Sequence, residues 1–255
     1  MTMRILIVNK FLYLRGGDCV HSLNLKQLLR NAGHDVCFYA MSYSQNIVCE
    51  ENKYFAEEIS FSAKDLQGKI KAASRIIWGI GVVQNFKKLL EEFQPDVVHL
   101  NNIHSYLSPI VAKLAYQRGV KVIWTLHDYK LICPSYSCLC KGNTCEACFT
   151  DKKHVVLRKC MKNSFPASIL AWGEAMNWNK NKLSLWTNSF ICPSQFMAEK
   201  MQQGGYPASK LQVISNFIGE EQVQYIINTP NPIREEAYAY IGRLSQEKGV
   251  ESLLK

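Results

Sequence analysis

The chain has 255 residues, of which 47% are hydrophobic and 20% are charged, and its formal net charge is +9 at pH 7. This composition is that of an ordinary folded globular protein, and the length leaves room for one large domain or two small ones. No apolar run approaches the roughly 18 residues that span a bilayer. Since the N-terminus also lacks the cleavage region of a signal peptide, we expect a cytoplasmic protein.

The positive charge predicts an anionic partner, such as a phosphorylated substrate or an acidic membrane surface. Basic residues are modestly concentrated in one stretch, at Lys152, Lys153, Arg158, Lys159 and Lys162. This stretch is either solvated surface or a contact with an anionic membrane on the inner face of the cell. No signature of a nucleic-acid-binding module accompanies it, so we expect no nucleic-acid partner.

The first 40 residues predict a strand, a loop, a helix and a second strand. The strands are residues 4–9 and 35–40, and Asp18 is a suitable N-cap for the helix between them. Gly16 and Gly17 stand at the entry to this helix, where backbone N–H groups and the positive end of the helix dipole favour a phosphate. Their spacing is not that of the G-x-G-x-x-G dinucleotide fingerprint.

The middle of the chain continues the alternation of strands and helices. We expect a short strand near residues 58–61, a helical region over 66–93, a strand at 96–100, a helix at 111–118 and a strand at 120–126. Strands that alternate with helices predict an α/β fold with a doubly wound parallel sheet.

Polar residues follow two of these strands. Asn102 and His104 come after residues 96–100, and His127 and Asp128 come directly after residues 120–126. Because ligands of open α/β sheets bind outside the carboxyl ends of the strands, we expect these side chains to share one site. A histidine in this position could instead only bond to a nearby backbone carbonyl.

Ten cysteines are many for a cytosolic chain, and five of them fall within residues 133–148. A reducing compartment argues against structural disulfides. Cys145 and Cys148, with Cys140 upstream and Cys160 downstream, could form a four-thiolate zinc site, although the spacings are irregular. The alternative is a set of free thiols in an ordered loop.

The remainder of the chain predicts one or two helices over residues 154–186, a strand at 190–192, a helix at 195–203 capped by Ser194, and a strand at 211–214. We expect the three tryptophans within residues 154–186 to lie in the core; they are Trp172, Trp178 and Trp186.

Residues 217–236 show no clean periodicity and contain two prolines, so we interpret them as an interdomain linker after a first domain over residues 1–216. A strand at 237–241 and a helix from Gly249 would then begin a second domain over residues 237–255.

Residues 240–255, Y-I-G-R-L-S-Q-E-K-G-V-E-S-L-L-K, resemble the opening of the C-terminal domain of family 4 glycosyltransferases. Other motifs agree in the same order: Gly16-Gly17, G-H-D-V from Gly33, D-V-V-H-L-N-N-I-H from Asp96, T-L-H-D from Thr125, C-P-S-Q-F from Cys192 and V-I-S-N from Val213. The resemblance implies the GT-B fold, with a Rossmann-like acceptor-side N-terminal half. It also implies retaining transfer of a sugar from a nucleotide-diphosphate donor. The H-D-Y-K-L-I-C-P run from His127 is most similar to members that build bacterial surface polysaccharides.

The resemblance also implies roles for individual residues. His127 would lie beside the donor sugar, and the backbone of Gly16 and Gly17 would face the donor diphosphate. Arg243 and Lys248 would contact this diphosphate, where two cations offset the charge that develops on the leaving nucleotide. The acceptor side would be lined by Asn102, His104 and Asp128. No Asp-x-Asp metal motif occurs in the expected setting, so we expect no catalytic metal and no cofactor besides the donor itself.

The family's paired-glutamate element and closing helix do not occur in these 255 residues, so we expect this chain to be inactive alone. The leading hypothesis is a peripheral-membrane transferase that acts on a saccharide or lipid-linked acceptor in surface polysaccharide synthesis. One alternative is a non-catalytic module that binds the acceptor or a membrane. Another is a zinc-thiolate redox or nucleic-acid protein, based on the cysteine loop and the charge.

Overall fold

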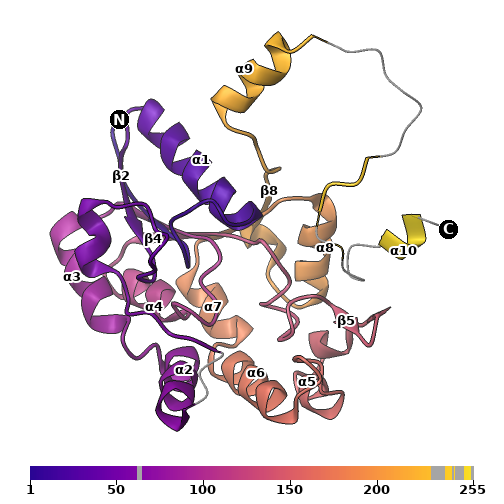
Figure 1. Cartoon of the computed structure of the whole chain (residues 1–255). Helices are drawn as coiled ribbons and strands as arrows, with labels where there is room; N and C mark the ends of the chain where they lie inside the picture. The colour runs from indigo at the N-terminus through magenta and orange to yellow at the C-terminus, as the bar shows by residue number, and fades with distance from the viewer. Residues whose placement is uncertain (62–64, 231–238, 243, 245–249, 254–255) are drawn as a thin grey trace.

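The computed structural model of the chain describes residues 1–61, 65–230, 239–242, 244 and 250–253 (Figure 1). Its described part is built on a parallel sheet of six strands in the order β2-β1-β3-β4-β7-β8. The doubly wound α/β fold predicted from the alternation of strands and helices is therefore confirmed.

The strands consist mainly of β-branched and aromatic residues, which suit a sheet covered on both faces. They are β1 (Arg4–Val8), β2 (Asp35–Tyr39), β3 (Val97–Leu100), β4 (Lys121–Thr125), β7 (Ser189–Cys192) and β8 (Leu211–Val213). Side chains in the middle of the sheet are fully buried, among them Leu6, Val98 and Phe190. All six strands were predicted at these positions.

The helices that accompany the sheet are α1 (Gly17–Asn31), α2 (Leu66–Trp78), α3 (Val83–Phe93), α4 (Ile110–Gln117), α5 (His154–Leu157), α6 (Phe165–Asn177), α7 (Lys180–Trp186) and α8 (Gln195–Gln203). Figure 1 shows α1 on one side of the sheet and α4 and α7 on the other. From β1 the chain runs to β2 on one side and later returns to β3 on the other. This reversal places a topological switch point between β1 and β3, at which ligands of such sheets bind.

The prediction of one helical region over residues 66–93 was wrong, because the chain breaks between α2 and α3. Gly79 and Gly81 have φ angles of +70° and +82°, which L side chains rarely adopt. The buried Arg75 fixes the break, since its Nε donates to the carbonyl oxygen of Ile80 at 2.5 Å and its Nη1 to that of Tyr106 at 2.9 Å.

Four smaller predictions also need correction. Residues 58–61 form no strand, and the nearest pairing is an isolated bridge between Met41 and Ala56. The N-cap of α1 is Gly16, whereas Asp18 lies in the first turn of the helix. Residues 154–186 form three helices, α5, α6 and α7, and not one or two. Trp172 is 38% exposed, although the other two tryptophans of this region are buried as expected.

Residues 220–228, in the segment interpreted as a linker, form the helix α9 (Glu220–Asn228), which has no buried residue and stands away from the sheet in Figure 1. The division of the chain near residue 216 stays a prediction. Residues 239–241 adopt no strand, and residues 237–238 of that predicted strand lie outside the described residues. The last described element is α10 (Val250–Leu253). None of the described helices is both long and apolar enough to cross a bilayer.

Candidate functional site

The candidate site lies at the carboxyl ends of β3 and β4, next to the switch point, and is centred on His127. The Nε2 atom of this histidine lies 3.0 Å from Oδ1 of Asn101, which follows β3. Since a carbonyl oxygen only accepts, Nε2 donates this hydrogen bond and Nδ1 keeps its lone pair in the neutral ring. Burial, followed by the neighbouring His21, lowers the pKa of His127 to about 4. The ring is therefore uncharged at neutral pH.

His21 connects this histidine to the start of α1. The rings of His21 and His127 meet edge to face with 5.1 Å between their centroids, and Phe217 lies 5.2 Å from His21 on another side. Burial also lowers the pKa of His21. The structure thus brings the first helix to the strand ends, which joins the predicted donor-binding segment to the predicted catalytic residue.

The two glycines at this helix start leave its N-terminal end open. Gly16 caps α1 in an extended conformation, and neither Gly16 nor Gly17 has a positive φ angle. A Cβ atom added at Gly17 would meet nothing within 4 Å. The backbone conformation therefore does not require glycine at these two positions. A side chain at Gly17 would project into the open space from which a ligand would approach the helix. Nearby, Lys10 and Asp18 form an ion pair at 3.2 Å.

The residues predicted on the acceptor side line one small hollow that His127 also borders. The imidazole of His104 stacks on Trp124 at 5.3 Å, and burial holds its pKa well below the usual range. Oδ1 of Asp128 accepts the backbone N–H of Lys130 at 2.8 Å, and burial raises the pKa of this carboxyl group. Asn102 also lines the hollow.

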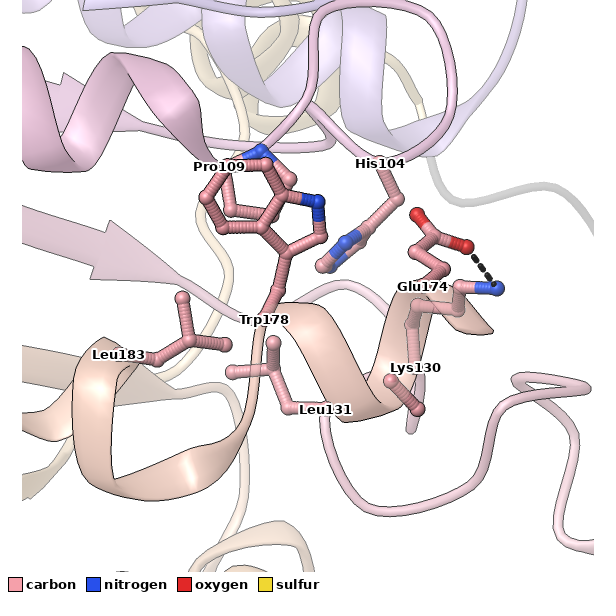
Figure 2. Close-up of a pocket in the computed structure, with 8 residues that line it drawn as sticks. His104, Pro109, Lys130, Leu131, Glu174, Trp178 and Leu183 are labelled. Carbon is pink, nitrogen blue, oxygen red and sulfur yellow. Dashed lines mark ion pairs between the residues drawn. The ribbon is translucent and has the colours of Figure 1, made fainter. Parts of the chain in front are cut away.

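His104 also borders a second small hollow, which is lined by two charged side chains that meet there (Figure 2). Nζ of Lys130 lies 2.8 Å from Oε2 of Glu174 on α6 and donates to the carbonyl oxygen of Pro134 at 2.7 Å. Both side chains of the pair are more than 90% buried. The second carboxylate oxygen, Oε1 of Glu174, is buried and has no hydrogen-bond partner among the described residues.

His99, which belongs to β3, lies beneath the site and has a structural role. It is buried, its Nε2 lies 2.8 Å from Oγ1 of Thr125 on β4, and burial lowers its pKa to about 3. The ring nitrogen Nε2 therefore takes part in a hydrogen bond between the two strands.

Several contributors to the site were not singled out from the sequence. His21 stands in a helix without any motif, and Glu174 is one acidic residue in an otherwise apolar stretch, 44 positions from Lys130. Of these contributors, Asn101 alone could have been inferred from the sequence, because it falls in the polar run after β3. Two predicted donor-binding residues, Arg243 and Lys248, lie outside the described residues.

The cysteine loop contains a small hairpin of β5 (Leu139–Cys140) and β6 (Asn143–Thr144). Burial, followed by the neighbouring thiol of Cys140, raises the pKa of Cys160 to about 12. Cys145 instead accepts a hydrogen bond from Arg158 at 3.1 Å. In the described part of the chain no three His, Cys, Asp or Glu side chains are grouped to hold a metal ion. The four-thiolate site stays a prediction.

Lys152 and Lys153, two of the five basic residues between positions 152 and 162, make polar contacts within the protein. Nζ of Lys152 donates to the carbonyl oxygens of Ile132 and Cys148 at 2.6 and 2.7 Å. Lys153 pairs with Asp151 at 2.9 Å. The other three members of the stretch are exposed.

Comparison with known proteins assigns the family. The model of Glycosyltransferase Family 4 matches residues 15–222, which is most of the chain. The chain therefore belongs to glycosyltransferase family 4, as the motifs predicted. A curated relative, an uncharacterized glycosyltransferase of Methanosarcina acetivorans, is 36% identical over 107 residues, covering 38% of this chain and 28% of the relative.

Two similar solved structures are distant in sequence. The catalytic domain of starch synthase IV from Arabidopsis thaliana has a TM-score of 0.49 at 11% identity, over 87% of this chain and 53% of that one. The UDP-GlcNAc 2-epimerase of Neisseria meningitidis has a TM-score of 0.44 at 13% identity, over 84% of this chain and 47% of that one. The chain thus spans about half the length of these proteins.

Proposed function

We propose that this chain carries the acceptor-side half of a retaining GT-B glycosyltransferase. The enzyme takes its sugar from a nucleotide-diphosphate donor and passes it to a saccharide or lipid-linked acceptor in surface polysaccharide synthesis. The family supports the reaction class, and the motifs after His127 support the kind of product. The protein would work in the cytoplasm, peripherally on the inner face of the membrane.

One observation carries the proposal: an uncharged His127 lies beside the open N-terminal end of α1. When a glycosyl bond breaks, positive charge develops on the sugar ring and negative charge on the leaving group. A helix N-terminus stabilises the negative diphosphate. A neutral imidazole can hydrogen-bond to the sugar without repelling its positive charge, which an imidazolium would do.

The division of the site into two sides follows the same geometry. Gly16 and Gly17 would face the donor, and the hollow beyond His127 would take the acceptor, with Asn102, His104 and Asp128 around it. Polar groups beside aromatic rings suit a sugar, because hydroxyl groups need hydrogen bonds and the C–H faces of the ring need apolar contact.

The test measures nucleoside-diphosphate release by the complete enzyme, in which this chain is joined to a donor-binding half, with a panel of nucleotide sugars and a saccharide acceptor. Removing one transition-state hydrogen bond costs about 10²–10³ in kcat. We therefore expect His127→Ala to lower kcat by at least about 100-fold. The matched control is His154→Ala on α5, which should release product at the wild-type rate. Unchanged turnover in His127→Ala, with the fold intact by circular dichroism, would remove this residue from the mechanism.

The same assay separates the proposal from a non-catalytic module. The described site residues cluster on the acceptor side, which is the feature that such a module would share. Binding of the acceptor without nucleotide release from any donor would favour the module.

A further inference from the structure

The helix α6 has an unusual distribution of side chains. Its inner face holds the polar Ser168 and Glu174, both buried, and the latter pairs with Lys130. Its outer face carries four large apolar residues spaced by four, three and four positions, which places them in one stripe along the helix. These are Phe165, Ile169, Trp172 and Met176, and they are 52%, 42%, 38% and 51% exposed. We call these four residues the α6 stripe.

The neighbouring helix α2 also exposes apolar side chains. It packs against α6, where Trp178 Nε1 donates to the carbonyl oxygen of Ile76 at 2.7 Å and Asn177 Nδ2 to that of Ile77 at 2.5 Å. Leu66, Ile70 and Trp78 on α2 are each more than half exposed. Figure 1 shows α2, α6 and α5 at the same edge of the molecule. Single exposed apolar residues are common on protein surfaces, whereas large apolar residues that are exposed on two adjoining helices indicate an interaction surface.

The charges around these helices are mainly positive, although Asp65 caps α2 and Glu57 pairs with Lys71 on that helix. Between residues 66 and 90 there is no acidic residue, and between residues 154 and 186 the single one is the buried Glu174. The same segments contain exposed cations, among them Lys69, Lys159 and Lys162, and these three take part in no ion pair with any described residue. Apolar side chains with a mainly positive rim suit an anionic bilayer, because the apolar side chains insert into the bilayer and the cations are attracted to its surface.

We propose that the α6 stripe, with the exposed face of α2, docks the protein on a membrane of anionic lipid. This inference rests on the proposed function, since a lipid-linked acceptor is held in such a membrane. Glu174 on the inner face of α6 and Trp178, directly after the helix, both border the hollow next to His104. One helix therefore has its outer face on the lipid and its inner face on the acceptor side of the site, which gives a lipid-linked saccharide a short path to the site.

The test is co-sedimentation of the full chain with vesicles of phosphatidylcholine alone or with about one third phosphatidylglycerol, at low and high salt. These vesicles contain neither donor nor acceptor. We expect binding to the anionic vesicles only, weakened by salt because screening shortens the reach of the charges. The double variant Phe165→Ser/Met176→Ser should bind at least about tenfold more weakly, because both side chains would lose their apolar surroundings in the membrane. Lys159→Glu/Lys162→Glu should lose a similar factor.

Matched controls sit on other exposed surfaces. Leu28→Ser/Tyr116→Ser changes two side chains of 52% and 43% exposure on α1 and α4, and Lys88→Glu reverses a charge on α3; all should bind as the wild type does. The inference would be overturned if the wild-type protein did not bind anionic vesicles at low salt, or if the stripe variant bound them as strongly as the wild type. It would also be overturned if the stripe variant changed its oligomeric state or melting temperature, because this would show that protein covers the stripe. Nucleotide release with a water-soluble acceptor is read separately, so failure of the docking and failure of the proposed function are distinguishable.

Discussion

The buried ion pair between Lys130 and Glu174 gives the sharpest prediction for stability. Their side chains are 8% and 6% exposed and the charged atoms are 2.8 Å apart, so each charge depends on the other in place of water. Removing one partner of such a pair costs roughly 3–5 kcal/mol, because the remaining charge stays buried and unpaired. We expect this loss for Glu174→Leu and for Lys130→Met. At about 2–4 °C per kcal/mol for a domain of this size, the melting temperature falls by roughly 6–20 °C.

The double variant Lys130→Met/Glu174→Leu should recover most of the stability, because replacing a whole buried pair by apolar side chains is often neutral. Urea unfolding of the four proteins, followed by tryptophan fluorescence, measures this coupling directly. The matched control is the pair of Lys71 and Glu57, at nearly the same separation of 2.7 Å but 50% and 69% exposed. Breaking it should change stability far less, because water screens the charges. The reasoning would be refuted if each single variant lost less than about 1 kcal/mol of unfolding free energy. It would also be refuted if the double variant lost as much as the two single variants together.

Two further predictions concern the interior. Gly79→Ala should destabilise the protein by about 2–4 kcal/mol in urea unfolding, because the residue has φ +70° and its Cβ would lie 2.4 Å from Cγ2 of Ile110. Gly119→Ala, at φ +72° with nothing nearby, isolates the backbone strain and should lose only about 1–2 kcal/mol; equal losses would contradict the steric part. Burial lowers the pKa of His99 to about 3, below its value in the unfolded chain, so the unfolded state binds more protons as the pH falls through about 6.5. This group alone should therefore remove about 2 kcal/mol of stability between pH 7 and pH 5. His99→Gln should reduce the slope by this share, while His21, His104 and His127, whose pKa values burial also lowers, keep theirs; an unchanged slope would contradict the assignment to His99.

The sequence was sufficient for the sheet because each strand carries its own signal. Runs of β-branched and aromatic residues that end in polar residues identify a buried parallel strand and the edge at which it stops. The positions of His127 and Asn102 in one site follow from that edge alone. The break between α2 and α3 depends instead on tertiary contacts, since Gly79 packs against Ile110 and Arg75 bonds to the loop before α4. No local pattern in residues 66–93 contains that information.

The same distinction applies to the site. His21 reaches His127 because α1 folds back over the strand ends, and this depends on how the helix packs and not on any spacing between the two residues. Glu174 is the clearer case, because a single carboxylate in an apolar helix is expected on the solvent side. Here the carboxylate is turned inward to meet Lys130, and the apolar residues of the α6 stripe are turned outward. The rule that apolar faces point to the core therefore predicts the reverse of what is found. On α6 the inner face has a buried cation as its partner, and the proposed membrane would be the apolar partner of the outer face.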